Sequence, residues 1–350
     1  MTPSLHEQIT CVIPTHNRPA FLRRLLHYLE LTDEIIPIQI CDSSDTARRT
    51  ENETTVRGFA GSCRLTYSHI ESGIYSKIRQ TMEQVETPFT VFCADDDFLF
   101  SDAVLGCAGF LDQSPEYCCA QGAMVSLSTG KQNKCYVLTN YSLEAENPVR
   151  RFRQFASNWY STFYSVCRTS MLTRAYQVAD EATDYDRARI LPEILLSQMT
   201  VILGRIKYLP GLYILREEHE LNDSRLPIVQ DMEHCEELYL SFRDALAREL
   251  SEHSGATSDH ACSVVEEAYG YLRDGGAAQA SRKRTIQHRI QREAKRQYRR
   301  MMSALRSDRI LQRRRLSNSD SLCRNSAFLQ ARELMVRFPN GIDSETSAAA

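Results

Sequence analysis

The sequence predicts an α/β fold built on a mostly parallel sheet flanked by helices. Over the first 130 residues, short apolar segments alternate with segments whose apolar residues recur every three or four positions. Strands joined through helices form parallel sheets, which bind ligands at the carboxyl ends of their strands. Three predicted strands are followed by polar segments, PTHNR, CDSSD and ADDD. The same edge of the sheet is therefore the expected site.

The predicted elements follow one another closely. The first strand is ITCVIP (9–14), and the helix after it (18–30) has Pro19 near its start and places five apolar residues on one face. Further strands are expected at 35–41, 64–70 and 89–94, around CAQGAMVSL and around IKYLPGLYIL. Further helices are expected at 75–85, 102–113, 150–165 and 191–203. The strands and helices up to residue 230 form one predicted domain, 1–230.

A helical region is predicted at 231–338, followed by a disordered tail at 339–350. Its helices are expected at 236–250, 259–273 and 326–338, with a basic amphipathic helix at 282–315. That basic segment has fourteen Lys and Arg against two acids, although the whole chain has a net charge of only -3. Three interpretations stay open: contact with an anionic membrane surface, binding of nucleic acid (the less favoured partner), or packing on the acidic remainder of the chain.

Composition and cysteine usage predict a cytoplasmic protein. No apolar run approaches the roughly 18 to 20 residues that cross a bilayer, and the first residues lack the pattern of a secretory signal. Most of the twelve cysteines lie inside apolar runs, and no CxxC pair occurs, so they are expected to be reduced. The basic helix adds the possibility of peripheral contact at the inner membrane surface.

The acidic triplet Asp95, Asp96 and Asp97 directly follows a predicted buried strand. Adjacent carboxylates repel one another, and a divalent cation with oxygen ligands relieves that repulsion. The alternative is a solvated turn that caps the next helix. The position at the ligand-binding edge of the sheet favours the cation site, here for Mn²⁺ or Mg²⁺.

The segments ITCVIPTHNRPAFLRRLLHYL, IPIQICDSSD and TPFTVFCADDDFLF, in this order and spacing, resemble GT-A fold glycosyltransferases of the family-2 type. The resemblance covers about residues 8–225. It implies that Asp97 is the metal ligand, Asp96 the ribose contact and Asp95 a supporting residue. It also implies that Asp42 contacts the nucleotide base.

The resemblance implies further contacts to the donor nucleotide. Residues of the loop after the first strand are expected to line the pocket, and the helix before the acidic strand is expected to contribute cations, with Lys77 favoured over Arg79. The loop residues are Thr15, His16, Asn17 and Arg18. An ordinary loop histidine and a solvated helix face are the alternatives for His16 and for the two cations.

The resemblance also implies a catalytic base on a later helix. Glu193 is the candidate there, and its apolar neighbours are expected to raise the pKa of its carboxyl group. Asp184 and Asp186 are rival candidates, and the alternative for Glu193 is a first-turn residue that the helix dipole favours. The resemblance also implies that Arg216 and His219 bind the diphosphate. Trp159 and Tyr160 are candidate acceptor contacts, because aromatic faces stack on sugar rings, although core packing is the alternative.

The predicted function is that of a metal-dependent, inverting glycosyltransferase of the hexosyltransferase type. It would transfer a sugar from a nucleotide-sugar donor, with a UDP-sugar favoured, to a hydroxyl of a glycan or lipid-linked acceptor. Two alternatives remain at this stage. One is a nucleotidyltransferase on a related fold, disfavoured because PTHNRPAF has no glycine. The other is a non-catalytic binding protein that acts through its basic helix.

Overall fold

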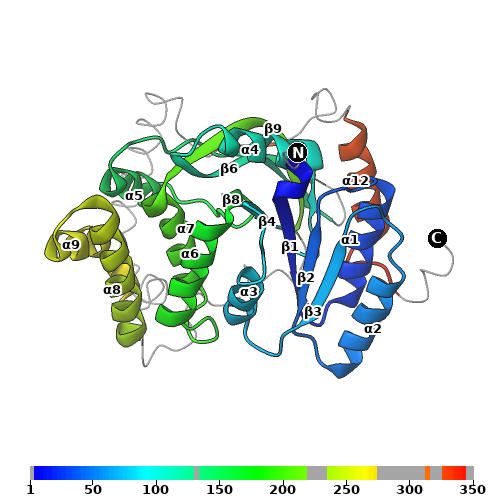
Figure 1. Cartoon of the computed structure of the whole chain (residues 1–350), viewed down its shortest axis with the longest axis horizontal. Helices are drawn as coiled ribbons and strands as arrows, with labels where there is room; N and C mark the ends of the chain where they lie inside the picture. The colour runs from blue at the N-terminus through cyan, green and yellow to red at the C-terminus, as the bar shows by residue number, and fades with distance from the viewer. Residues whose placement is uncertain (1–3, 130–133, 219–234, 274–311, 316–324, 344–350) are drawn as a thin grey trace, which may run out of the picture.

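The computed structural model describes residues 4–129, 134–218, 235–273, 312–315 and 325–343 (Figure 1). Within these residues the strands are β1 (Ile9–Thr15), β2 (Ile38–Asp42), β3 (Leu65–His69), β4 (Phe89–Phe92), β5 (Phe98–Leu99), β6 (Tyr117–Ser128), β7 (Lys134–Thr139), β8 (Val166–Arg168), β9 (Arg205–Glu218) and β10 (Gln312–Arg315). The helices are α1 (Pro19–Leu31), α2 (Thr46–Arg57), α3 (Ile74–Met82), α4 (Ser101–Asp112), α5 (Pro148–Ser157), α6 (Thr169–Ala182), α7 (Ile190–Leu203), α8 (Cys235–Ser254), α9 (Ser258–Tyr269) and α12 (Ser326–Arg337). The α/β fold class is confirmed.

One sheet organises the molecule, with strand order β10-β7-β6-β8-β4-β1-β2-β3, while β9 pairs with β6 and with the short β5. β1 to β4 run parallel to one another. β2 and β3 lie on one side of β1, whereas β4 lies on the other, so the order of the strands reverses between β1 and β4. Such a topological switch point leaves a crevice outside the carboxyl ends of the two strands, where open α/β sheets bind ligands.

The register of the parallel strands places the predicted polar residues side by side. Thr15 at the end of β1 pairs with Asp42 at the end of β2, and Asp42 pairs with His69 at the end of β3. On the other side, Val12 pairs with Phe92, the last residue of β4. The acidic triplet therefore begins beside the end of β1.

β1 is buried along its whole length because strands flank it on both sides and helices cover both faces. Ile9, Cys11 and Ile13 belong to a core that includes α1, α4 and α12, whereas Val12 packs on the opposite face with residues of α3 and α6. In α1, the predicted apolar face is buried, with Leu22 and Leu25 at most 1% exposed. Each such leucine stabilises the fold, and replacing it by alanine costs about 2–5 kcal/mol.

A second apolar cluster lies away from β1–β3, where α8 and α9 pack against α5, α6 and α7 (Figure 1). Phe242 and Leu246 of α8 are fully buried there, one turn apart on the same face. The structure confirms these two predicted helices, with ends that differ by a few residues from the expected ones.

Two helices of the structure were not predicted from the sequence, α2 and α6. α2 has a single buried residue, Asn52, so it lacks an apolar stripe. Asp45 caps it by accepting a hydrogen bond from the backbone N–H of Arg48 (3.1 Å), and pairs such as Arg49–Glu53 (2.7 Å) support it.

α6 directly follows the short β8, where no separate helix was expected. The predicted helix 150–165 is wrong in its second half, since α5 ends at Ser157.

The end of the chain also differs from expectation. Residues 312–315 form β10, which pairs antiparallel with β7, so the prediction that the basic helix runs to residue 315 is wrong for this part. The rest of that helix lies outside the described residues. α12 packs into the same core as β1 and α1 through Phe328, Ala331 and Met335. The disordered tail predicted from residue 339 is contradicted as far as residue 343, because Ile342 is 3% exposed and bonds to α1.

None of the described helices is both long and apolar enough to cross a membrane. Every cysteine whose side chain the structure describes is a free thiol. Most of them are buried among apolar residues, in line with the prediction of reduced, structural cysteines.

Candidate functional site

The acid loop, residues Ala94–Asp97, follows β4 at the switch point of the sheet. A backbone hydrogen bond from the N–H of Asp97 to the carbonyl of Ala94 (3.1 Å) closes the turn, and the Cys93 thiol donates to the carbonyl of Asp97 (3.4 Å). The loop's three carboxylates are buried, with exposed fractions of 2% for Asp95, 7% for Asp96 and 1% for Asp97. Because they do not point into bulk water, the solvated-turn alternative does not describe them.

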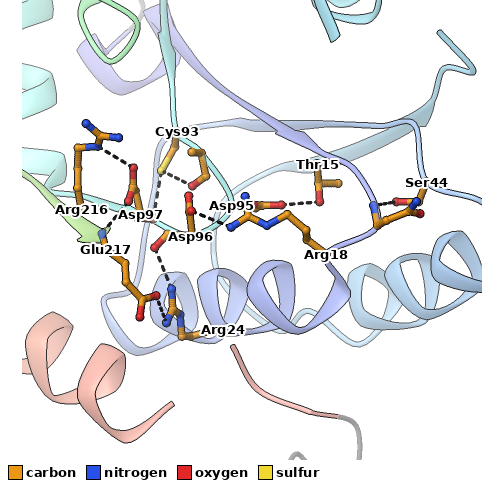
Figure 2. A network of polar contacts seen from close by, with 12 residues as sticks. Thr15, Arg18, Arg24, Ser44, Cys93, Asp95, Asp96, Asp97, Arg216 and Glu217 are labelled. Carbon is orange, nitrogen blue, oxygen red and sulfur yellow. Dashed lines mark hydrogen bonds and ion pairs between the residues drawn. The ribbon is translucent and has the colours of Figure 1, made fainter. Parts of the chain in front are cut away.

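Arg18, which directly precedes α1, binds two of these carboxylates (Figure 2). Its Nη1 lies 2.9 Å from Oδ1 of Asp95, and its Nη2 lies 2.7 Å from Oδ2 of Asp96. The Thr15 hydroxyl donates to the other oxygen of Asp95 at 2.7 Å. The polar loop after β1 and the acid loop therefore form one connected site, as predicted for Thr15 and Arg18.

Asp97 is bound from the opposite side, by residues of β9 and of the segment before β8. The Tyr164 hydroxyl donates to Oδ2 of Asp97 (2.5 Å), and the Nε of Arg216 donates to the same oxygen (3.2 Å). The backbone N–H of Glu217 donates to Oδ1 (2.9 Å). The carboxylate of Asp97, the predicted metal ligand, therefore already accepts three hydrogen bonds from the protein. Asp96 has the most exposed carboxylate of the loop.

The charges of the site do not cancel. Three carboxylates face two guanidinium groups, those of Arg18 and Arg216, which leaves a formal charge of -1. Burial raises the pKa of Asp95 against the opposing effect of Arg18. Burial likewise raises the pKa of Asp97, and the neighbouring Asp96 raises it further. Additional positive charge at this loop would therefore be stabilising.

Asp42 lies at the end of β2, in the predicted place, but its carboxylate is occupied by its own protein. Oδ1 accepts from the backbone N–H (2.7 Å) and from the hydroxyl (2.5 Å) of Ser44. Oδ2 accepts from Nδ2 of Asn52 (2.8 Å) and from the Tyr67 hydroxyl (2.7 Å). Burial alone would raise the pKa of Asp42, but these hydrogen bonds outweigh it and the pKa is lowered. Asp42 therefore organises the β2 loop, and a nucleotide base would have to compete with four donors.

Lys77 and His16 join the loops after β1 and β2. The buried Nζ of Lys77 donates to the carbonyl of Thr15 (2.7 Å) and to the hydroxyl of Ser43 (2.9 Å), and burial lowers its pKa. Nδ1 of His16 lies 2.9 Å from the carbonyl of Ser43, so Nδ1 carries the hydrogen. Asn17 adopts a left-handed φ of 55°, which asparagine tolerates. Its backbone N–H donates to the hydroxyl of Ser44 at 2.7 Å.

Arg79 is not part of this site. It lies on the same helix as Lys77, but its guanidinium pairs with Asp180 of α6 (2.7 Å) and with Glu83 (2.6 Å). The favoured choice of Lys77 over Arg79 agrees with this geometry. His219 lies outside the described residues.

Glu193 is half-buried in the first turn of α7, and its carboxylate makes no hydrogen bond within the described part of the chain. Burial raises its pKa, and the positive charge of Arg216 opposes that shift. The positive charge of Arg216 therefore opposes the raised pKa of both Asp97 and Glu193. The rival Asp186 is exposed, and Asp184 accepts backbone hydrogen bonds from Asp186 (3.0 Å) and Arg187 (3.2 Å) in its own turn.

The two predicted acceptor residues differ in their surroundings. Tyr160 is 3% exposed, and its hydroxyl donates to the carbonyl of Tyr141 (2.9 Å). Its ring packs edge-on against Tyr141 and Phe155, so it is a core residue, the alternative left open from the sequence. Trp159 is partly buried, and its Nε1–H is a buried donor without a hydrogen bond in the described residues.

Several residues of the site were missed by sequence reasoning. Their roles depend on contacts between distant segments, and no local pattern marks them. They are Arg24, Asn52, Tyr67, Tyr164 and Glu217. The only available signal was a general one: a polar side chain such as Arg24 within an apolar helix face needs a buried partner.

The chain has an α/β fold of the GT-A-like type, with its polar site at the switch point of the sheet. Residues 1–349 of S. aureus TarS in complex with UDP-GlcNAc are similar in structure, with a TM-score of 0.51 and 15% sequence identity over 81% of this chain and 77% of that chain. The same TarS segment in complex with UDP gives a TM-score of 0.46 and 14% identity, again over 81% and 77% of the two chains. No protein-family model and no curated protein matches the sequence. The likeness establishes the fold.

Proposed function

We propose that this chain is a glycosyltransferase that transfers a sugar from a nucleoside-diphosphate donor to a hydroxyl acceptor. The observation that carries the proposal is the convergence of Thr15, Lys77 and the acid loop at one switch point. The half-buried carboxylate of Glu193 is linked to it through its electrostatic interaction with Arg216, which pairs with Asp97. The similarity to TarS, which was crystallised with UDP-GlcNAc, supports a UDP-sugar as the donor.

The acid loop suits a hard divalent cation, Mn²⁺ or Mg²⁺, because its ligands are carboxylate oxygens with an unbalanced negative charge. We assign the cation to Asp96, the most exposed of the three, with Asp95 beside it, in place of Asp97. Asp95 is bound by Arg18 and Thr15, whereas the oxygens of Asp97 already accept three hydrogen bonds. Arg18 is 30% exposed along its side chain, so it can leave Asp96 for a phosphate oxygen. When bound, the cation would offset the charge of the departing diphosphate.

The residues of the chain have distinct roles in this proposal. Lys77 fixes the two loops that hold the nucleoside, and Arg18 and Arg216 supply positive charge at the diphosphate. Glu193 accepts the proton of the acceptor hydroxyl, because its raised pKa makes it a stronger base than an exposed carboxylate. A single displacement with Glu193 as base inverts the anomeric configuration. The partly exposed ring of Trp159 is our candidate contact for a glycan or lipid-linked acceptor, because aromatic faces stack on sugar rings.

The deciding experiment is a thermal-shift panel of nucleoside diphosphates and nucleotide sugars, each with and without MnCl₂. A donor at a hundred times its Kd would add about 2.7 kcal/mol to the free energy of unfolding. We expect the largest shift with a uridine nucleotide and manganese. A coupled assay then follows the product: release of a nucleoside diphosphate from a nucleotide sugar supports sugar transfer, whereas release of pyrophosphate from a nucleoside triphosphate and a sugar phosphate shows a nucleotidyltransferase. A protein that no nucleotide stabilises would contradict the proposal.

A further inference from the structure

Arg24 is a fully buried arginine in the second turn of α1, and its guanidinium contacts three separate segments. Its Nη2 donates to the main-chain carbonyl of Asp96 (2.8 Å), and its Nη1 lies 2.7 Å from Oε2 of Glu217. Nη1 also donates to the carbonyl of Phe338 (2.9 Å). One side chain therefore joins the acid loop and β9 (Figure 2). The same side chain also joins both to the end of α12.

Glu217 carries this connection to the side chain of Asp97. Its backbone N–H donates to Oδ1 of Asp97 at 2.9 Å, and its Oε1 accepts from the hydroxyl of Thr129 at 2.8 Å. The Arg24–Glu217 pair thus fixes the main chain of Asp96 and the carboxylate of Asp97 together. Neither Arg24 nor Glu217 reaches the open side of the site, since both side chains are 0% exposed.

The segment Phe338–Ile342, here called the strap, docks on the first turn of α1. The backbone N–H of Ile342 donates to the carbonyl of Ala20 (2.9 Å), and Nη1 of Arg23 donates to the carbonyl of Ile342 (2.5 Å). Gly341 has a φ of 96°, and a Cβ there would lie 2.3 Å from the carbonyl carbon of Ala20. Only glycine fits both the backbone conformation and the close approach.

We propose that Arg24 is a positioning residue for the acid loop and that the strap holds Arg24 in place, so residues 338–342 shape a site whose residues lie far away in the sequence. The physical reason is hydrogen-bond satisfaction. If the Phe338 carbonyl is lost, one hydrogen of the buried Nη1 has no acceptor, although Nη1 still pairs with Glu217. This favours a shift of the guanidinium toward Glu217, which weakens the hydrogen bond of Nη2 to the carbonyl of Asp96. Only the identity of the ligand rests on the proposed function.

The first test needs no ligand and compares hydrogen exchange in Gly341→Ala and in the unmodified protein. The matched control is Gly255→Ala, which has the same kind of left-handed backbone (φ 71°) but open space around it, in the turn between α8 and α9. We expect amides of residues 94–99 to exchange about tenfold faster in Gly341→Ala, with α8 and α9 unchanged. Faster exchange confined to the strap and α12 would overturn the inference.

The second test measures the Kd of UDP by calorimetry in MnCl₂, well below the melting temperature of each variant. A roughly tenfold weaker Kd for Gly341→Ala, against an unchanged Kd for Gly255→Ala, supports the positioning role. An unchanged Kd despite a lowered melting temperature shows a purely structural strap and overturns the inference. If UDP fails to bind the unmodified protein, the proposed function fails instead, and the exchange experiment still decides the inference.

Arg23→Ala covers the case in which Gly341→Ala does not fold. It removes one strap hydrogen bond and leaves Arg24 itself intact. We expect a smaller increase of exchange at 94–99, in proportion to the increase at the strap. Exchange that rises at the strap and stays unchanged at 94–99 would again overturn the inference.

Discussion

Arg216 and Asp97 form an ion pair between segments 119 residues apart, with 3.2 Å between Nε of the arginine and Oδ2 of the aspartate. The same guanidinium lies over the ring of Tyr164 at 4.9 Å and opposes the raised pKa of Glu193. β9 thereby connects the acid loop to the candidate base.

Replacing Asp97 by alanine should destabilise the fold as well as the site. Tyr164, Arg216 and the N–H of Glu217 would lose their acceptor, and each unsatisfied buried donor costs about 1–3 kcal/mol. Urea denaturation at pH 7 measures the loss. Asp96→Ala is the matched control: we expect it to abolish manganese-dependent nucleotide binding with a much smaller loss of stability. Equal stability of the two variants would refute our assignment.

Replacing Glu193 by glutamine should lower kcat by about 10²–10⁴ while leaving the Kd of the nucleotide unchanged, because a glutamine cannot accept the proton. Steady-state kinetics and calorimetry provide the two measurements. Asp186→Asn is the control, since Asp186 is an exposed carboxylate close by in the sequence. A fully active Glu193→Gln protein would leave the reaction without its proposed base.

The acid loop should make stability depend on pH in an unusual direction. Burial raises the pKa of Asp95 from 3.8 to about 6, so the folded protein binds this proton more tightly than the unfolded chain. This contribution to stability is present below about pH 4 and is lost as pH rises through about 6. The stability of the protein relative to Asp95→Asn should therefore fall between pH 4 and pH 6 in metal-free buffer. Denaturant titrations at several pH values check this, and a rising difference would contradict it.

Replacing Lys77 or Arg79 of α3 by methionine should have different effects on the Kd of the nucleotide. Lys77→Met removes the donor to the Thr15 carbonyl and the Ser43 hydroxyl, so we expect the nucleotide Kd to weaken by about tenfold or more. Arg79→Met removes only half-exposed ion pairs with Asp180 and Glu83, worth about 0–1 kcal/mol, and the Kd should not change. Equal weakening in both variants would argue against a role for Lys77 in the site.

The parallel strands β1 to β4 can be predicted from the sequence, because their signals are local. β1, β2 and β4 are short apolar runs, and α1 has a clear apolar face. α2 cannot be predicted in this way, because it has no apolar face. Its only buried residue is the polar Asn52, which donates a hydrogen bond to Asp42. Tyr160 shows the opposite failure: an aromatic residue in a polar segment is consistent with a ligand contact, yet its ring fills the core.

The sequence by itself determines the fold class and the strands whose ends carry polar residues, because periodicity and strand-end chemistry are properties of neighbouring residues. The tertiary structure alone decides which donors meet each carboxylate. Asp42 is saturated by Ser44, Asn52 and Tyr67, and Asp97 by Tyr164, Arg216 and Glu217. The physical reason is that a hydrogen bond between distant segments depends on their relative position, which forms only when the whole core packs.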